Sequence, residues 1–270
     1  MGDIDLHLRS KRSDGVLSPT ELVDKAYSLG IKIMSLTDHD TVTGVEEAQR
    51  RAKELGITCI TGLEISARLN DEVHVLGYNV DTEDEEFKQQ IAEIQELRSK
   101  RNWEIIRKLH AHGVKVKVYD ELDGESRGRS HIAKMLYEQG FVHSRTEAFD
   151  KYIGKNAPCY QSDVGITPED AITLIKKAGG VPVLAHPFRF IKNGELEDFV
   201  ARMIKFGLGG IEVYYPNYGK DVRQSIKKVA EKYGLICTGG SDYHSEEYGA
   251  NIGSANVVLN DFTRKTLKLE

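Results

Sequence analysis

The sequence predicts an α/β protein in which parallel strands alternate with helices and a helical segment interrupts the alternation. Short apolar runs alternate with amphipathic helical patterns in residues 1–83 and again in residues 164–270. This order is typical of parallel strands joined by crossover helices. Residues 84–163 carry helical patterns and little strand signal, so we expect them to form a helical insertion. The 270 residues are enough to bury a sizeable core.

The first region shows a β-α-β-α-β order. Its first helix has a clear start, because Ser18 is a suitable N-cap, Pro19 stands in the first turn and Glu21 completes a capping box. Gly30 then marks the end of this helix. We expect strands at residues 4–7, 31–36, 57–60 (ending near 62–64) and 72–78, and a second helix at 45–55.

The insertion and the second region follow the same reasoning. In the insertion we expect a long helix at residues 85–109, shorter helices near 130–139 and 144–151, and an exposed strand at the alternating segment 115–118. In the second region, Thr167 and Pro168 begin a helix that ends at Gly179. Strands are expected at residues 181–187 and 210–214, with helices at 199–206 and 221–233. Residues 235–244 are expected to form a strand that runs into a turn.

The composition argues against long duplex nucleic acid and membranes as partners. The 37 Lys and Arg against 42 Asp and Glu give a net charge of −5, which offers no general attraction to long duplex nucleic acid or anionic lipid. No run approaches the length of a membrane span, and the N-terminus lacks the pattern of a secretory signal. Three cysteines lie far apart, at Cys59, Cys159 and Cys237, which suggests a reducing compartment. We therefore expect a cytoplasmic protein.

Histidines and acids stand at the ends of five predicted strands, and this placement is the main functional clue. These residues are His7, His39, Glu64, His186 and the pair Asp242 and His244. The carboxyl ends of parallel strands in a barrel converge on one face, where active sites form. Imidazole and carboxylate ligands suit Mn, Fe or Zn, and these residues exceed what one tetrahedral ion needs. Clustered divalent ions are suited to cleaving phosphate esters.

Other interpretations fit less well. A single histidine at a strand end is more often a hydrogen-bonded structural residue, but five such strand ends are hard to explain in that way. The sequence has no GxSxG nucleophile elbow, no GxxxxGK[ST] phosphate loop and no HExxH helix.

Several short motifs, taken in order, resemble those of the PHP (polymerase and histidinol phosphatase) superfamily. They are Asp5-Leu6-His7 with Ser13-Asp14-Gly15, Thr37-Asp38-His39-Asp40, Gly62-Leu63-Glu64, Ala185-His186-Pro187 and Gly240-Ser241-Asp242-Tyr243-His244. The chain most resembles the branch of nucleoside 3′,5′-bisphosphate phosphatases and 5′-to-3′ oligoribonucleases. This resemblance implies a distorted (β/α)7 TIM-like barrel with a helical insertion and a three-ion site, usually with manganese.

The resemblance also implies a ligand set and catalytic residues. The first ion would take His7, Glu64 and Asp242, the second Asp14, His39 and His244, and the third would share Glu64 and add His74 and His186. The catalytic residues would be His7, Asp14, His39, Glu64, His186 and Asp242. On its own, His74 would be interpreted as a core histidine of a strand. Asp38 and Asp40 are expected to orient His39 or a water.

One residue departs from the family pattern. The first family motif is His-x-His, whereas this chain has His7-Leu8-Arg9. Arg9 is always cationic and offers no lone pair to a metal. Three explanations stay open: the first ion binds more weakly, Arg9 supplies its charge and binds phosphate, or Arg9 replaces a natural histidine.

The insertion supplies candidate substrate contacts. Arg129 and His131 lie in Arg127-Gly128-Arg129-Ser130-His131, which resembles a family segment and falls at a predicted helix N-terminus, a natural anion site. Arg98 and Arg101 share one face of the long helix, where a solvated charged face is the simpler explanation. Together with Arg9, we interpret Arg101, Arg129 and His131 as substrate-binding residues.

These observations predict a metal-dependent phosphoesterase. Its expected substrate is a small nucleotide with a terminal phosphate, such as a 3′,5′-bisphosphate with an AMP-like product, or short RNA trimmed 5′ to 3′. Two or three divalent ions are expected, Mn first, with Fe, Zn or Mg as alternatives. Two rival hypotheses are a histidinol phosphate phosphatase and a binding or regulatory module with a degenerate metal site.

Overall fold

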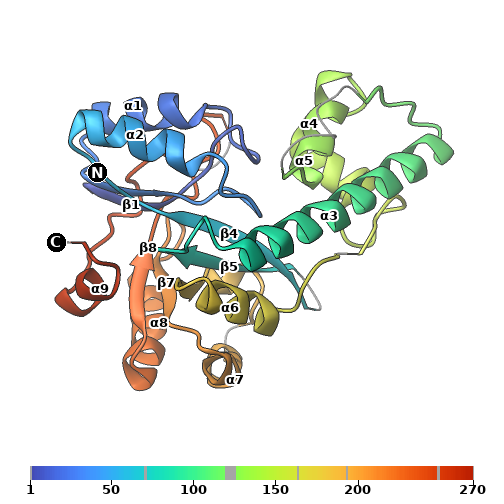
Figure 1. Cartoon of the computed structure of the whole chain (residues 1–270). Helices are drawn as coiled ribbons and strands as arrows, with labels where there is room; N and C mark the ends of the chain where they lie inside the picture. The colour runs from blue at the N-terminus through green and yellow to red at the C-terminus, as the bar shows by residue number, and fades with distance from the viewer. Residues whose placement is uncertain are drawn as a thin grey trace.

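The strands form two sheets (Figure 1) in this computed structural model, which describes residues 2–69, 72–118, 126–162, 164–192, 194–247 and 250–269. The first sheet pairs β1 (Ile4–Leu8), β2 (Ile33–Leu36) and β3 (Thr58–Ile60) in parallel. The second contains, in spatial order, β4 (Gly62–Arg68), β5 (Glu72–Tyr78), β6 (Val181–Leu184), β7 (Gly210–Tyr214) and β8 (Ile236–Gly239).

The expectation of parallel strands is wrong for β5. It pairs antiparallel with β4 on one side and with β6 on the other, whereas β6, β7 and β8 are parallel. The connection between Arg68 and Glu72 is too short for the crossover that a parallel neighbour requires. The strand expected at residues 57–60 is also followed at once by β4, so Glu64 lies inside a strand and not beyond its end.

Two isolated bridges join the sheets near the ends of their strands. Leu8 pairs with Tyr243 after β8, and His39 after β2 pairs with Glu64 in β4. The fold is therefore mixed α/β, with β1 bridged to the segment after β8 and β4 bridged to the segment after β2. Hydrogen bonding among the described strands gives two sheets, so the closed seven-stranded barrel stays a prediction.

Helices cover both sheets. In Figure 1, α1 and α2 lie over the β1 side, whereas α6, α7 and α8 lie on the side of the second sheet. The bounds of these helices are α1 Pro19–Ser28, α2 Val45–Leu55, α6 Pro168–Lys177, α7 Leu196–Met203 and α8 Lys220–Tyr233. A short helix near the C-terminus, α9 (Asp261–Thr266), was not expected from the sequence. The capping box of α1 is present, because Ser18 Oγ accepts from Glu21 N at 3.2 Å and Glu21 Oε2 accepts from Ser18 N at 2.7 Å.

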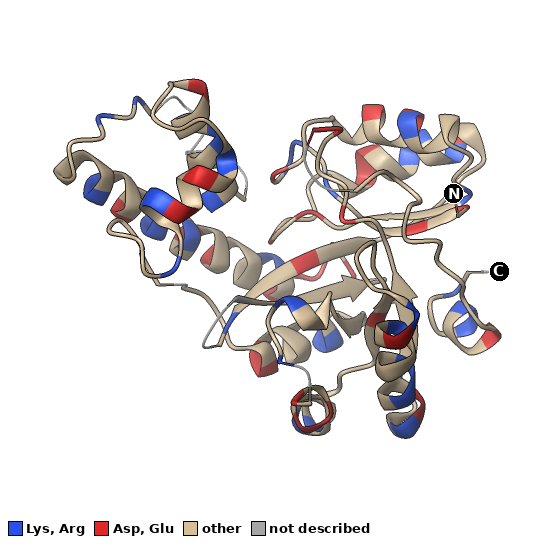
Figure 2. Cartoon of the chain, turned by 180° about the vertical axis from the view of Figure 1, so that it is seen from behind, with Lys and Arg blue, Asp and Glu red and all other residues tan. Residues whose placement is uncertain are grey.

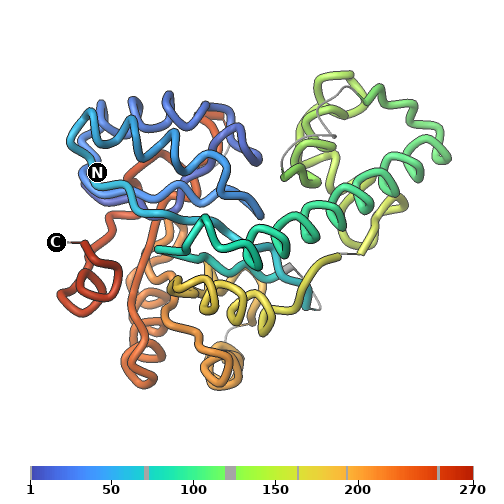
Figure 3. The backbone as a smooth tube through the Cα atoms, viewed as in Figure 1, coloured from blue at the N-terminus to red at the C-terminus, as the bar shows by residue number. Residues whose placement is uncertain are grey.

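The insertion projects from the sheets and has its own core. The chain leaves along α3 (Glu85–Ala111) and returns past α4 (Arg129–Glu138), α5 (Arg145–Ala148) and a π-helical turn at Phe149–Ile153 (Figure 3). A separate apolar cluster joins these elements and includes Ile105, Leu109, Ile132, Leu136 and Ile153. The expected boundary residue Asp163 lies outside the described residues.

The expected strand at residues 115–118 is wrong. This segment is irregular, and the Gln139 side chain takes the place of a neighbouring strand by accepting from Lys117 N and donating to Lys117 O, both at 2.8 Å. The alternating pattern arises because Val114 and Val116 are buried in the core of the insertion.

Charges of both signs are interspersed on the helices (Figure 2). Within the described residues, no helix combines the length and the apolar character that crossing a bilayer requires.

Candidate metal centre and active-site cavity

Glu64 in β4 is the meeting point of four histidines. Its Oε1 lies 3.3 Å from His7 Nε2 and 3.2 Å from His186 Nε2, and its Oε2 lies 3.1 Å from His39 Nδ1 and 3.3 Å from His74 Nδ1. These side chains come from β1, β5 and the segments after β2 and β6, so the fold brings together residues that are remote in sequence.

The donors form two compact groups of ligand atoms. One contains His7, His186 and Asp242, and the other contains His39, Glu64 and His74; within each group the atoms lie within 4.8 Å of one another. All six residues are buried. Clustered imidazole and carboxylate donors of this kind fit divalent ions.

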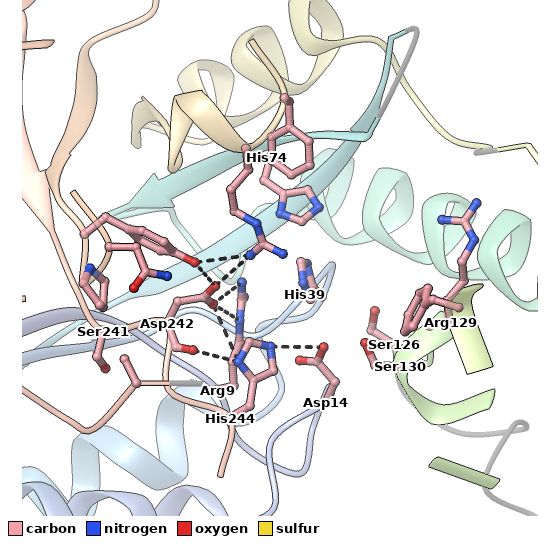
Figure 4. Close-up of a pocket in the computed structure, with 18 of the residues that line it drawn as sticks. Arg9, Asp14, His39, His74, Ser126, Arg129, Ser130, Ser241, Asp242 and His244 are labelled. Carbon is pink, nitrogen blue, oxygen red and sulfur yellow. Dashed lines mark hydrogen bonds and ion pairs between the residues drawn. The ribbon is translucent and has the colours of Figure 1, made fainter. Parts of the chain in front are cut away.

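Asp14 and His244 complete the predicted ligand set at the edge of the same site. His244 Nε2 lies 3.3 Å from Asp14 Oδ2, and its Nδ1 lies 2.7 Å from the backbone oxygen of Asp242. Figure 4 shows both side chains beside Asp242 and Arg9. The structure therefore brings all eight predicted metal ligands into one region.

Glu212 contacts two histidines of the candidate centre and is a residue that the sequence reasoning missed. It lies in β7 with no exposed surface, accepts from the backbone nitrogen of His186 at 2.8 Å, and lies 2.9 Å from His7 Nδ1. Glu212 thus orients two histidines of the centre without facing the cavity. The signal was an ionisable residue in the middle of the apolar strand 210–214, because a buried carboxylate needs a polar partner.

Asp5 has a related supporting role. It accepts from Ser241 N at 2.9 Å and from Gly253 N at 2.8 Å, and so ties β1 to the segment that carries Asp242. Burial raises the pKa of Asp5 to about 6, although these hydrogen bonds lower it. At Gly240, a Cβ atom would meet the Cβ of His7 at 2.3 Å, so only glycine lets this segment pack against β1.

Asp38 and Asp40 have partners that the sequence did not indicate. Asp38 accepts from Ser10 N at 2.7 Å and from Ser13 Oγ at 2.6 Å, so it shapes the loop after β1. Asp40 reaches His39 through Ser66, whose nitrogen donates to Asp40 Oδ1 at 2.9 Å and whose Oγ lies 3.2 Å from His39 Nδ1.

The backbone is strained at three residues of the site. Asp40, His186 and Asp242 have φ values of 48°, 23° and 52°, which side-chain-bearing residues seldom adopt. Such strain persists only where the surrounding structure enforces it, and it concentrates at functional sites.

The charges of the site are strongly coupled. Burial by itself would raise the pKa of Glu64, but Arg9 and the surrounding histidines hold it well below its usual range. For His7, burial by itself would lower the pKa, but the carboxylates of Glu212, Asp242 and Glu64 raise the pKa of His7 to about 10. The same surroundings lower the pKa of His39, because burial and Arg9 disfavour its charged form. Glu64 is therefore ionised and available to cations.

The guanidinium of Arg9 lies between the side chains of predicted metal ligands and contacts three of them. Its Nη2 donates to Glu64 Oε2, and lies 2.9 Å from His7 Nε2 and 3.3 Å from Asp242 Oδ1. Its Nη1 donates to the backbone oxygen of Thr37. Only 1% of Arg9 is exposed.

A cavity of about 700 Å³ lies between this centre and the insertion. One wall contains Arg9, Asp14, His39, His74, Asp242 and His244. Across it lie Ser126, Arg129 and Ser130 of the insertion (Figure 4). Arg101, Arg189, Phe149, Phe190 and Tyr215 also line the cavity.

The predicted substrate residues divide between different environments. Arg101 and Arg129 line the main cavity, whereas His131 lines a smaller neighbouring cavity and accepts from Gly128 N at 3.1 Å at the start of α4. The solvated face suggested for Arg98 and Arg101 is wrong, since both are buried. Arg98 Nη1 lies 2.7 Å from Asp40 Oδ2 and donates to Ser66 Oγ at 2.6 Å.

Comparison with known proteins gives matches over nearly the whole chain. The PHP domain family model matches residues 5–166. A 5′-3′ exoribonuclease from Haemophilus influenzae is 35% identical over 94% of this chain and 96% of its own length. A 3′,5′-nucleoside bisphosphate phosphatase from Chromobacterium violaceum is 32% identical over 94% of this chain and 91% of its own. The structure of a candidate metal-dependent phosphoesterase from Bifidobacterium adolescentis has a TM-score of 0.86 and 28% identity, covering 99% of this chain and 96% of that one.

Proposed function

The chain belongs to the PHP domain family of metal-dependent phosphoesterases. We propose that it releases phosphate from small nucleotides, such as a nucleoside 3′,5′-bisphosphate, or trims short RNA from its 5′ end. The observation that carries this proposal is the cavity of about 700 Å³ with clustered metal ligands on one wall and arginines and aromatic rings around it. Its volume is within the range of small-molecule sites.

The lining of the cavity matches the parts of a nucleotide. Arg101 and Arg129 offer cationic donors to phosphate oxygens, for which the guanidinium geometry is well suited. Phe149, Phe190 and Tyr215 offer ring faces on which a base can stack. We propose that residues 84–163 act as the cap that places these groups over the metal centre.

The ligand set supports divalent ions, and we propose Mn²⁺ as the natural one. His39, His74, His186, Asp14, His244 and Glu64 would hold the ions, with Glu64 shared between them. When bound, such ions polarise phosphoryl oxygens and make a water molecule acidic enough to attack phosphorus.

Other side chains prepare the site for this chemistry. Glu212 fixes the ring of His7, and the Tyr215 hydroxyl donates to Asp242 Oδ2 at 3.0 Å. Phe190 packs against His74 and His186, with ring centroids 5.0 and 5.3 Å away, and so keeps water from that side of the ligands.

A substrate panel tests the proposal. Protein loaded with Mn²⁺ is assayed with adenosine 3′,5′-bisphosphate, a 5′-phosphorylated short RNA, histidinol phosphate and an aryl phosphate. We expect kcat/KM for one of the two nucleotide substrates to exceed that for the aryl phosphate by about 100-fold or more, because only a nucleotide uses the base and second-phosphate contacts. A preference for histidinol phosphate would instead support the rival phosphatase activity. Absence of turnover with all four would support a binding module.

The arginine contacts provide a sharper test. Arg129→Met is expected to raise KM for the nucleotide about 10-fold with little change in kcat, since a charged contact to phosphate is lost. Arg107→Met on the exposed surface of α3 is the matched control and should leave both constants unchanged. An unchanged KM in Arg129→Met would remove this residue from the binding site.

A further inference from the structure

We propose that Arg9 is a built-in cation that takes the place of one divalent ion, so that this centre binds one ion fewer than the three-ion pattern implied by its family resemblance. The inference rests on the proposed metal centre and concerns how many ions that centre holds.

The contacts of Arg9 coincide with one predicted ligand set. His7, Glu64 and Asp242 are the three residues expected to bind the first ion, and the guanidinium of Arg9 contacts all three. Arg9 Nε also donates to Asp242 Oδ1 at 3.3 Å. The guanidinium therefore lies where the ligand atoms of this set point.

The position of Arg9 is enforced from several sides. The side chain is buried, and its Nη1 donates to the backbone oxygen of Thr37. Leaving this place would remove a cation from two buried carboxylates, Glu64 and Asp242, which is strongly unfavourable. A guanidinium also keeps its charge at every physiological pH, so deprotonation cannot make room for an ion.

The other predicted ligand sets stay largely clear of Arg9. Asp14 and His244 pair with each other at 3.3 Å, and His74 lies 3.4 Å from His186. Of the described residues in these sets, Glu64 is the one that accepts a hydrogen bond from Arg9. A guanidinium beside Glu64 and Asp242 repels a divalent cation at the first set, while the remaining sets keep their donors.

Metal counting tests the proposal without relying on activity. Wild-type protein, Arg9→His and Arg189→His are stripped with chelator, saturated with Mn²⁺, desalted and analysed by inductively coupled plasma mass spectrometry and native mass spectrometry. Arg189→His is the matched control, because Arg189 also contacts Asp242 at 3.3 Å but is 47% exposed. We expect about two ions per chain in wild type and in Arg189→His, and about three in Arg9→His, which regains an imidazole ligand.

Thermal unfolding gives a second readout. In chelator, Arg9→His should melt below wild type because Glu64 and Asp242 lose their cation, and Mn²⁺ should raise its melting temperature more than that of wild type. About three ions in wild type would overturn the proposal even if Arg9→His does not fold, and so would equal ion counts in folded wild type and folded Arg9→His. Wild type that binds no Mn²⁺ would instead overturn the metal centre itself, together with the proposed function.

Discussion

At the residue scale, the centre depends on side chains that are not themselves predicted ligands. Glu212 holds His7 and the backbone of His186 in place, and Asp5 holds the segment before Asp242. Hydrogen bonds of this kind fix the ring orientation of a ligand and raise its basicity. The positions of His7 and His186 therefore depend on the Glu212 carboxylate.

Replacing Glu212 with glutamine tests this dependence. Glu212→Gln is expected to weaken Mn²⁺ binding by about 10-fold, because the oxygen that holds the backbone nitrogen of the proposed ligand His186 loses its charge. Isothermal titration calorimetry measures the affinity, and circular dichroism confirms that the variant is folded. Glu197→Gln, on the exposed surface of α7, is the control. An affinity equal to that of wild type would show that Glu212 has only a packing role.

His131 gives a prediction about pH. Burial lowers the pKa of His131 to about 4, with Arg127 adding to the effect and Asp14 opposing it. An unfolded chain has a histidine pKa of about 6.5, so the unfolded state binds the proton more tightly. The stability that this residue contributes is present above about pH 6.5 and is lost as the pH falls toward 4.

The measurement compares urea unfolding at pH 7 and pH 5 in metal-free buffer. We expect His131 to account for a loss of about 1 kcal/mol between these values, after allowing for its partial exposure. His131→Gln keeps a side chain suited to the third helical position and should remove this part of the pH dependence. His143→Gln, an exposed histidine of the same insertion, should leave it intact. A pH dependence identical in all three proteins would contradict the assignment.

At the element scale, helix α3 connects the insertion to the metal centre. Its residue Arg98 is buried and contacts Asp40 and Ser66. Asp40 follows His39 in the sequence, and Ser66 Oγ lies 3.2 Å from His39 Nδ1. Gln95 on the same helix donates to the backbone oxygen of Asp40 at 2.8 Å. The insertion is thus attached to the site through polar contacts as well as through its chain ends.

Removing the Arg98 contact should destabilise the protein strongly. Arg98→Met removes the guanidinium from the buried Asp40 carboxylate. Loss of one partner of a buried ion pair typically lowers the free energy of unfolding by about 3 kcal/mol. Arg107→Met removes an exposed arginine of the same helix, paired with Glu104, and should cost less than about 0.5 kcal/mol. Urea unfolding monitored by circular dichroism gives both values. Equal stability of the two variants would show that α3 is held by apolar packing alone.

At the scale of the whole molecule, metal binding is expected to stabilise the fold. The ligands come from both sheets, so an ion that binds them holds distant parts of the chain together. A ligand that binds only the folded state at about 100 times its Kd adds about 3 kcal/mol of stability.

Thermal melting measures this linkage. Saturating Mn²⁺ is expected to raise the melting temperature by about 5–10 °C relative to protein in chelator. Asp14→Asn, which weakens one of the proposed donors, should show a smaller rise. Identical melting curves with Mn²⁺ and with chelator would contradict binding at this centre.

Much of the local structure could be predicted from the sequence. The cap of α1 at Ser18, the long helix expected at residues 85–109 and most strand positions follow from short-range patterns. The strand at 115–118 failed because burial of alternate valines produces the same pattern as a strand. The antiparallel direction of β5 does not follow from its apolar pattern, because that pattern is the same in both directions; the short connection to β4 decides it.

The sequence by itself determined the chemistry of this protein: the histidines and acids near strand ends, and the motifs that place it in its family. Only the tertiary structure decided which of these groups meet. It placed Glu64 among four histidines, Glu212 behind them, Arg98 on Asp40, and Arg9 inside one ligand set. The physical reason is that helix caps and periodicity depend on neighbours within a few residues, whereas ion pairs and ligand clusters depend on contacts between segments far apart in the chain.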